Sequence, residues 1–272
     1  MGGVRQFLAP SRAELRDHLI TAAIAGEVAT PRENNLANFH RMSSRQPLYL
    51  FGLQPVGEWS PDDVLELMVE RCGVSPDRDH RYGPDTIDVE RTLDSLDSMA
   101  ARIAQAAARR ERVMVATGHP VGLRPTHTAV ARALREAGCT LLTPAAGWPH
   151  PEDTAYGRQH GRIKHLDDVA VLASFGGLLH HTHSPLPMRA MLDELAAAGR
   201  DAPDLVVADH GWAGEAGQRG LDVVGFADCN DPALFVGEAE GRIRVAVPLD
   251  DNVSPHLYEP MTRYLLERAG VG

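Results

Sequence analysis

DLVVADHGWAGEAGQRGLDVVGFADCNDP, residues 204–232, contains two short apolar runs that each end in acidic or histidine side chains. Residues 204–208 lead into Asp209 and His210, and residues 223–227 lead into Asp228. Three further runs end in the same way: 113–116, 175–179 and 243–247. If all five are parallel strands of one sheet, their carboxyl ends lie along one edge, where open α/β sheets bind ligands. The pattern predicts an active site at that edge.

The alternation of predicted strands, loops and helices after residue 110 indicates the fold class. It favours an α/β fold, namely a three-layer, Rossmann-like and mostly parallel sheet of about five to six strands. Helices are expected at 126–137, 187–198, 231–239 and 254–269, with a further strand at 139–142. We expect these elements to form an α/β catalytic domain over residues 111–272.

The first part of the chain, residues 1–110, predicts a mainly helical segment that packs on this domain. Capping patterns at Ser11 and Ser60 begin two helices, and a third is expected at 87–110. Between the first two helices, residues 31–45 are polar and show no clear period. Long irregular segments in compact domains are usually functional or disordered. We therefore expect Asn34, His40 and Arg45 to bind substrate.

Composition excludes several classes of protein. The 272 residues carry a net charge of −10, which argues against a general nucleic-acid binder. No apolar stretch approaches the ~18–20 residues that cross a membrane. The N-terminus lacks the apolar run of a secretory signal, so a cytoplasmic protein is expected. The three cysteines form no CxxC pair and suggest neither a disulfide framework nor a thiolate zinc site.

The loop at 117–126 has the residues of an anion site. Backbone N–H groups of Gly118 and Gly122, with Thr117, can approach an anion ahead of a helix start, and Arg124 can grip a phosphate. His119 is a candidate acid, base or metal ligand. The loop is neither a Walker sequence nor a GxGxxG fingerprint. The alternative is an ordinary strand-to-helix turn in which His119 packs or caps.

Histidines and aspartates at three strand ends suggest a metal site. His181 and His183 point to the same side of an extended segment, and Asp209, His210 and Asp228 are their natural partners. Catalytic zinc, manganese or iron sites mix histidine with carboxylate. A divalent ion (Mg, Mn or Zn) is therefore the expected cofactor. The alternative is one buried, hydrogen-bonded histidine with solvated neighbours.

Two acidic clusters near the C-terminus have both functional and structural interpretations. Asn230 is a candidate substrate ligand, but either Asn230 or Asp231 can instead cap the helix that begins at Pro232. The cluster 250–252 pairs two carboxylates with an amide, a set of oxygens that suits Mg²⁺. Helix capping ahead of Ser254 explains that cluster about equally well.

Five strings of sequence resemble a known family. They are ATGHPVGLRP (116–125), HTHSPLPM (181–188), VADHGWAGEAGQ (207–218), GFADCNDPALFVGEAEG (225–241) and VPLDDNV (247–253). They look like a bacterial family, typical of actinobacteria, whose members are called simply phosphatase. The resemblance covers most of the chain and implies phosphatase activity.

The leading hypothesis is metal-assisted hydrolysis of a small phosphomonoester such as a sugar phosphate. The catalytic candidates are His119, which can protonate the leaving alcohol, with His181, Asp209 and Asp228. The expected partner is a small phosphorylated metabolite, with no nucleic acid or membrane and with a homo-oligomer left open. Two alternatives use the same residue types: a metal-dependent lyase or isomerase, and a non-enzymatic protein that binds a phosphorylated ligand.

Overall fold

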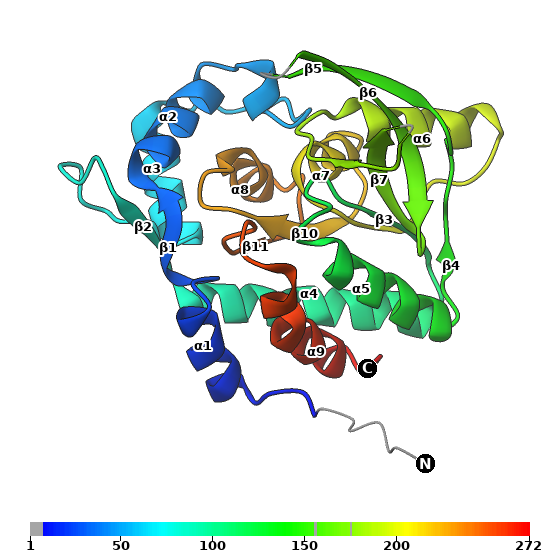
Figure 1. Cartoon of the computed structure of the whole chain (residues 1–272), viewed down its shortest axis with the longest axis horizontal. Helices are drawn as coiled ribbons and strands as arrows, with labels where there is room; N and C mark the ends of the chain where they lie inside the picture. The colour runs from blue at the N-terminus through cyan, green and yellow to red at the C-terminus, as the bar shows by residue number, and fades with distance from the viewer. Residues whose placement is uncertain (1–7, 155–156, 175) are drawn as a thin grey trace.

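The computed structural model describes residues 8–154, 157–174 and 176–272, and these residues form a nine-stranded sheet with helices on both faces (Figure 1). The strand order is β11-β10-β9-β3-β7-β6-β5, with β4 beside β3 and β8 beside β7. Its parallel centre consists of β3 (Arg112–Ala116), β9 (Leu205–Val207), β10 (Val223–Ala227) and β11 (Val245–Pro248). The predicted α/β class with a mostly parallel sheet is confirmed, although the sheet is larger than expected.

The additional strands extend the sheet beyond β3. β7 (Val169–Ser174) lies parallel to β3, and β6 (Gly157–Leu166) and β5 (Pro149–Thr154) follow in antiparallel order. Asp167 and Asp168 join β6 to β7 with φ angles of 50° and 69°. Such left-handed pairs suit a tight hairpin, but Asn-Gly or Asp-Gly is the usual signal. The Asp-Asp pair therefore gave little indication of these strands.

The predicted parallel strand at 175–179 is wrong. Phe175 lies outside the described residues, and Gly177, with φ 89°, forms a turn in which its N–H donates to the carbonyl of Ser174. The chain therefore reverses after β7, and only β8 (Leu179–His180) pairs, antiparallel to β7. β3 pairs with β7 only as far as Ala116. Beyond that point, β8 pairs with the same edge of β7.

Helices cover both faces of the sheet. On one face lie α4 (Val89–Arg109), α5 (Arg124–Glu136) and α9 (Glu259–Arg268), which follows the short η2 (Pro255–Tyr258). On the other face lie α6 (Leu186–Ala197), α7 (His210–Gln218) and α8 (Pro232–Ala239) (Figure 1). Apart from α7, these helices lie where the sequence predicts them.

The glycines of α7 explain both why it was missed and how it packs. A Cβ atom at Gly211 would lie 2.2 Å from the carbonyl oxygen of His183, and one at Gly214 would lie 2.1 Å from that of Phe51. Glycine weakens a helix by itself. Here it allows the helix to touch neighbouring backbone, which only the folded protein reveals.

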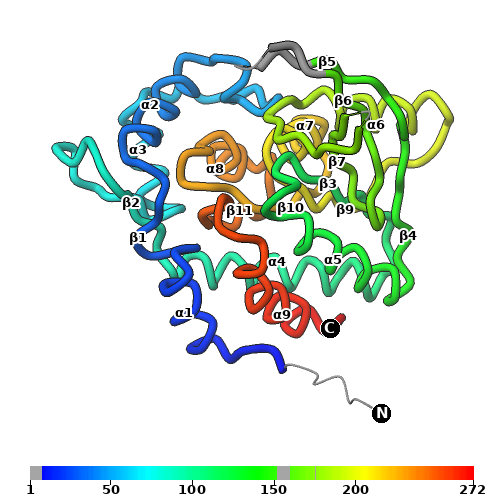
Figure 2. Tube along the Cα trace, in the orientation of Figure 1, coloured from blue at the N-terminus to red at the C-terminus, as the bar shows by residue number. Residues whose placement is uncertain are grey.

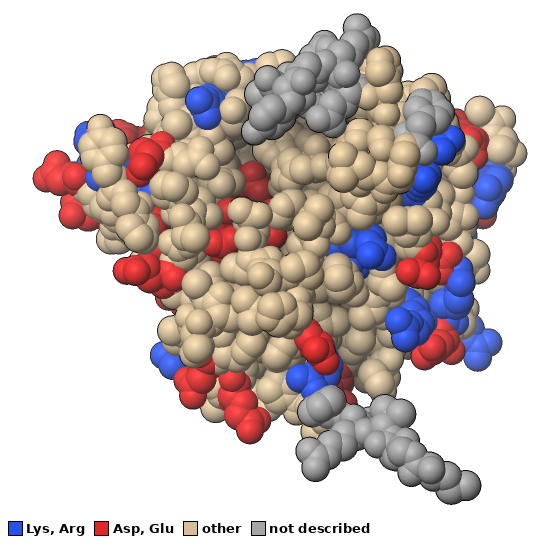
Figure 3. Space-filling view, viewed as in Figure 1, with Lys and Arg blue, Asp and Glu red and all other residues tan. Residues whose placement is uncertain are grey.

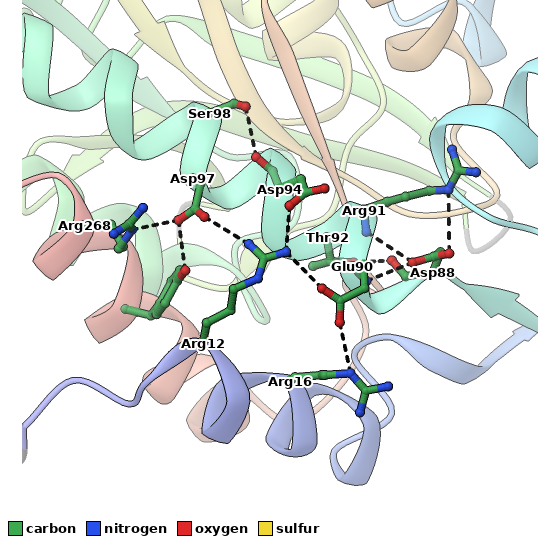
Figure 4. Close-up of polar contacts among 11 residues, drawn as sticks. Arg12, Arg16, Asp88, Glu90, Arg91, Thr92, Asp94, Asp97, Ser98 and Arg268 are labelled. Atoms are coloured by element: carbon green, nitrogen blue, oxygen red, sulfur yellow. Dashed lines mark hydrogen bonds and ion pairs between the residues drawn. The ribbon is translucent and has the colours of Figure 1, made fainter.

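The N-terminal helix α1 (Arg12–Thr21) begins at the predicted Ser11 cap. The guanidinium of Arg12 donates to Glu90, Asp94 and Asp97 on α4 (Figure 4). Arg268 of α9 also donates to Asp97. These ion pairs attach α1 to the layer formed by α4 and α9. α3 (Pro61–Arg71) starts at the predicted Ser60 cap and packs on α8.

Residues 31–45 correct a further expectation, because most of them form the helix α2 (Arg32–Ser43). Arg32 and Asp85 form a fully buried ion pair at 2.8 Å, and Asn35 also donates to Asp85. Phe39 and Met42 are buried as well. The polar residues of α2 thus find partners inside the protein, which a search for apolar periodicity misses.

Asp85 lies on β2 (Pro84–Ile87), which pairs antiparallel with β1 (Gly26–Pro31) in a separate two-stranded sheet. The remaining short elements are β4 (Thr140–Leu141) and η1 (Pro47–Tyr49). Among the described helices, none is both long and apolar enough to span a membrane.

Candidate functional site

A cavity of about 530 Å³ lies at the carboxyl ends of the parallel strands. Segments β1 and α2 line one side of this cavity, and the loops after β3, β8, β9, β10 and β11 line the other. In Figure 2, β1 and α2 lie to the left of β10 and β11. In the space-filling view, acidic side chains are visible in a hollow between these segments (Figure 3). The side chains that line it include Asn34, Asn38, Arg41, Tyr49, His119, His181, His183, His210, Asp228, Asn230, Asp231, Asp250 and Asp251.

Three histidines converge in this cavity. The ring centroids of His181 and His183 lie 4.8 Å apart, and each lies 5.0 Å from that of His210. One ring nitrogen from each lies within 4.8 Å of the other two. Desolvation, with the nearby His210, lowers the pKa of His183 to about 2. A neutral imidazole has a free lone pair, which is the form that binds a metal ion.

His210 is oriented from behind by Asp209. Its Nδ1 lies 2.8 Å from Asp209 Oδ1, so Nε2 faces the cavity at 3.4 Å from Asp251 and 3.5 Å from Asp231. Burial alone would lower the pKa of His210, but Asp231, Asp209 and Asp251 raise it to about 10. His210 also has a left-handed φ of 48° at the start of α7. Non-glycine residues in this region are uncommon and concentrate at functional sites.

Asp209 itself is fully buried and does not line the cavity. Its Oδ1 accepts the N–H of Gly118 at 2.6 Å, and its Oδ2 lies 3.4 Å from Nε2 of the buried His127. Burial alone would raise the pKa of Asp209, but the hydrogen bond and charge of His210, with His127, lower it. The structure therefore places an ionised carboxylate behind His210.

Four buried carboxylates also line the cavity: Asp228, Asp231, Asp250 and Asp251. Asp228 accepts the hydroxyl of Thr30 at 2.7 Å and the N–H of Cys229 at 2.6 Å. Burial and the adjacent Asp251 raise the pKa of Asp228 well above its usual value. Burial also raises the pKa of Asp231 to about 7. Crowded carboxylates of this kind need protons or a cation to offset their repulsion.

The donor set fits a divalent metal ion. Histidine nitrogens and carboxylate oxygens are the ligands of zinc, manganese and magnesium in proteins. Nδ1 of His119 is also buried without a hydrogen-bond partner among the described residues, 3.5 Å from Asp251. His181, His183 and His210 are the residues best placed to hold such an ion, and His210 would release its Nε2 proton when the ion binds.

Half of the predicted site residues come together here, whereas the glycine loop has another position. His119, His181, His183, His210, Asp228, Asn34 and Asn230 line the cavity. Thr117 accepts the N–H of His119, while the N–H of Gly118 is bonded to Asp209. A Cβ atom at Gly122 would lie 2.6 Å from the carbonyl oxygen of Asp251. Arg124 lies 3.9 Å from Asp167 and outside the cavity lining.

The helix α2 changes which of its residues reach the cavity. His40 is exposed, and Arg45 donates to the carbonyls of Pro55 and Gly57, so neither belongs to the cavity lining. Asn34, Asn38 and Arg41 do line it, together with Tyr49. Their spacing of four and then three residues puts them on one face of a helix. That spacing was the available signal, and it was missed because 31–45 was interpreted as irregular.

The fold and this cavity define an α/β protein with a histidine- and aspartate-rich site of the kind that enzymes use for hydrolysis. The chain belongs to the family described as Phosphatase, which it matches over residues 10–272. It is similar to Phosphatase SCO2771 of Streptomyces coelicolor, with 52% identity over 264 residues, 96% of this chain and 97% of the relative. The predicted family is thereby confirmed.

Proposed function

We propose that this chain hydrolyses a small phosphomonoester in the cavity at the carboxyl edge of its sheet, with the help of a divalent metal ion. The observation that carries the proposal is the convergence of His181, His183 and His210 in one cavity of a Phosphatase-family chain. A small phosphorylated metabolite, such as a sugar phosphate, is the proposed substrate class.

The three histidines would hold the metal ion, and Asp209 would keep the Nε2 of His210 directed at it. Carboxylates that bind the second nitrogen of a metal-ligating histidine fix its ring and raise its basicity. Asp228 lines the same cavity, and its carboxylate would add to the negative charge that attracts the cation. A bound divalent ion would polarise the phosphoryl group and lower the pKa of water.

The helix α2 would position the phosphate. Arg41 lines the cavity, and its guanidinium lies 5.0 Å above the ring centre of Tyr49 and donates to Asn38 at 3.0 Å. The planar guanidinium has five N–H donors, so several remain for phosphate oxygens. Asn34 and Asn230 add amides on either side of the cavity.

His119 would act as the general acid. In the proposed reaction a water oxygen attacks phosphorus and loses a proton to solvent, the bond from phosphorus to the ester oxygen breaks, and His119 gives its proton to the departing alkoxide. His119 then regains a proton from solvent, and the products are the alcohol and inorganic phosphate. Asp251, 3.5 Å from Nδ1 of His119, would hold the imidazole in position. Proton transfer of this kind contributes about 10²–10⁴-fold to a rate.

The test is phosphate release from a panel of sugar phosphates and nucleotides, with Mg²⁺, Mn²⁺ or Zn²⁺ and with a chelator. We expect metal-dependent release, and a loss of about 10²-fold or more in both His183→Ala and Asp228→Ala, comparable to removing one transition-state donor. Asp201→Asn, on an 83% exposed side chain, is the control and should retain full activity. Full activity in both site variants would contradict the proposal. Substrate loss without free phosphate would indicate a lyase or isomerase instead.

A further inference from the structure

We infer that the cavity binds two divalent ions, one at His181, His183 and His210 and a second at Asp228, Asp250 and Asp251. This deepens the proposed function and rests on it only in taking this cavity as the metal centre. Each group of three supplies ligand atoms that lie within 4.8 Å of one another.

The two groups form one continuous row of donors. His210, Asp231 and Asp251 make a third set within the same 4.8 Å limit, and this set shares one residue with each of the others. His210 thus belongs to the histidine group and Asp251 to the carboxylate group, with 3.4 Å between Nε2 and Oδ2. Three histidines and four carboxylates exceed the four ligands of a typical zinc ion or the six of magnesium. One ion would leave part of the row without a cation.

The charge of the cavity aspartates also supports two bound ions. The four aspartates that line the described cavity are 2–7% exposed and carry four negative charges when ionised. One divalent ion would leave two of those charges to be neutralised by protons, whereas two ions would compensate all four. Uncompensated buried charges are costly because water cannot solvate them.

The carboxylates of the second group are buried, and hydrogen bonds hold two of them in fixed positions. Asp228 is held by Thr30 and Cys229, and Oδ1 of Asp250 accepts the N–H of Asn252. Each carboxylate oxygen has two lone pairs, so these bonds leave donor capacity for a metal ion.

An independent observation is His119, which is 9% exposed and whose Nδ1 has no hydrogen-bond partner among the described residues, although it lies 3.5 Å from Oδ1 of Asp251. A buried polar atom without a partner is rare in a native protein and calls for a ligand or water beside it. The two groups also differ in chemistry. Imidazole nitrogens suit zinc, whereas carboxylates alone suit magnesium or manganese.

The experiment measures metal binding by the full chain without substrate. The protein is stripped with a chelator and titrated with Mn²⁺, and bound metal is counted by equilibrium dialysis with elemental analysis. Electron paramagnetic resonance then shows whether the bound ions are magnetically coupled. The variants are Asp250→Asn for the carboxylate group and His183→Asn for the histidine group, with Asp228→Asn as a second carboxylate variant. Asp201→Asn is the exposed control, and circular dichroism verifies folding.

We expect two ions per chain and a coupled spectrum in the wild type and in Asp201→Asn. Each site variant should bind one ion and give an uncoupled spectrum. One ion in the wild type, or the loss of both ions in a folded Asp250→Asn and Asp228→Asn, would overturn the inference. Two coupled ions without phosphate release would refute the proposed function alone, and phosphate release with a single ion would refute only the second site.

Discussion

At the scale of single residues, His210 connects the two halves of the site. Its Nδ1 is bonded to the buried Asp209, and its Nε2 lies between Asp231 and Asp251. The left-handed φ of 48° places this ring at the junction of β9 and α7. The sequence placed Asp209 and His210 together at a strand end. It did not reveal that one faces the cavity and the other lies behind it.

Asp209→Asn should weaken metal binding while the fold is retained. The amide is neutral, so His210 loses the charge that raises its basicity. Replacing a residue that hydrogen-bonds a metal-ligating histidine typically costs about 10–100-fold in metal affinity or activity. Competition with a coloured chelator for Zn²⁺ would measure the affinity, with Asp201→Asn as the control. Unchanged affinity in Asp209→Asn would show that Asp209 does not act through His210.

The pKa shift of His183 predicts a pH dependence of stability in the metal-free protein. The folded pKa is about 2, while an unfolded histidine titrates near 6.5. Below about pH 6.5 the unfolded state therefore binds a proton that the folded state rejects, and stability falls by at most about 1.4 kcal/mol per pH unit for this group. Asp231, with its pKa raised to about 7, has the opposite effect between about pH 4 and 7.

A variant isolates the contribution of His183 from that of Asp231. Between pH 6.5 and 4, the wild type should lose free energy of unfolding relative to His183→Asn, as measured by urea denaturation of chelator-treated protein. His40→Asn, at an exposed position, should follow the wild type. Parallel pH curves for wild type and His183→Asn would contradict the prediction.

At the scale of elements, local signals predicted the helices that have caps and apolar stripes. The Ser11 and Ser60 caps and the stripe of α4 are local features, and the corresponding helices are present. The elements that were missed depend on distant partners. α2 is stabilised through Asp85, about 50 residues away, and α7 packs its glycines against the backbone of Phe51 and His183.

The face of α2 that lines the cavity yields a prediction about substrate binding. Arg41→Ala should raise KM for a phosphomonoester by about 10-fold or more, because hydrogen bonds to charged groups are worth about 1.5–3 kcal/mol. Arg41→Lys should recover part of this loss, since it keeps the charge without the planar fork. His40→Ala, the adjacent exposed residue, is the control and should leave steady-state KM unchanged. An unchanged KM in Arg41→Ala would remove Arg41 from the site.

At the scale of the whole molecule, one arginine joins the amino ends of three parallel strands. Arg102 of α4 is 5% exposed and contacts Glu111, Asp204 and Asp222 at 2.6, 3.0 and 2.5 Å. These residues directly precede β3, β9 and β10. The network thus lies at the edge opposite the cavity, where it aligns strands whose other ends carry the site.

Arg102→Met should reduce stability without changing the chemistry. Removing one partner of a buried ion pair costs about 3–5 kcal/mol because the remaining charges stay buried. Since Asp222 is partly exposed, we expect a loss of free energy of unfolding near the lower end of this range. Urea unfolding at pH 7 would measure the loss, with the 71% exposed Arg109→Met as the control. Equal stability of the two variants, or lost phosphate release in folded Arg102→Met, would contradict this separation of roles.

By itself, the sequence determined the α/β alternation and the placement of histidine and aspartate at strand ends. Both are local properties: apolar period, caps, and the rule that carboxyl ends of parallel strands share an edge. The tertiary structure alone decided which side chains face the cavity and that α2 closes it. Those outcomes depend on contacts between residues far apart in the chain, such as Thr30 with Asp228 and Asn38 with Asn230. No local pattern encodes such contacts, because their free energy exists only once the distant segments have packed together.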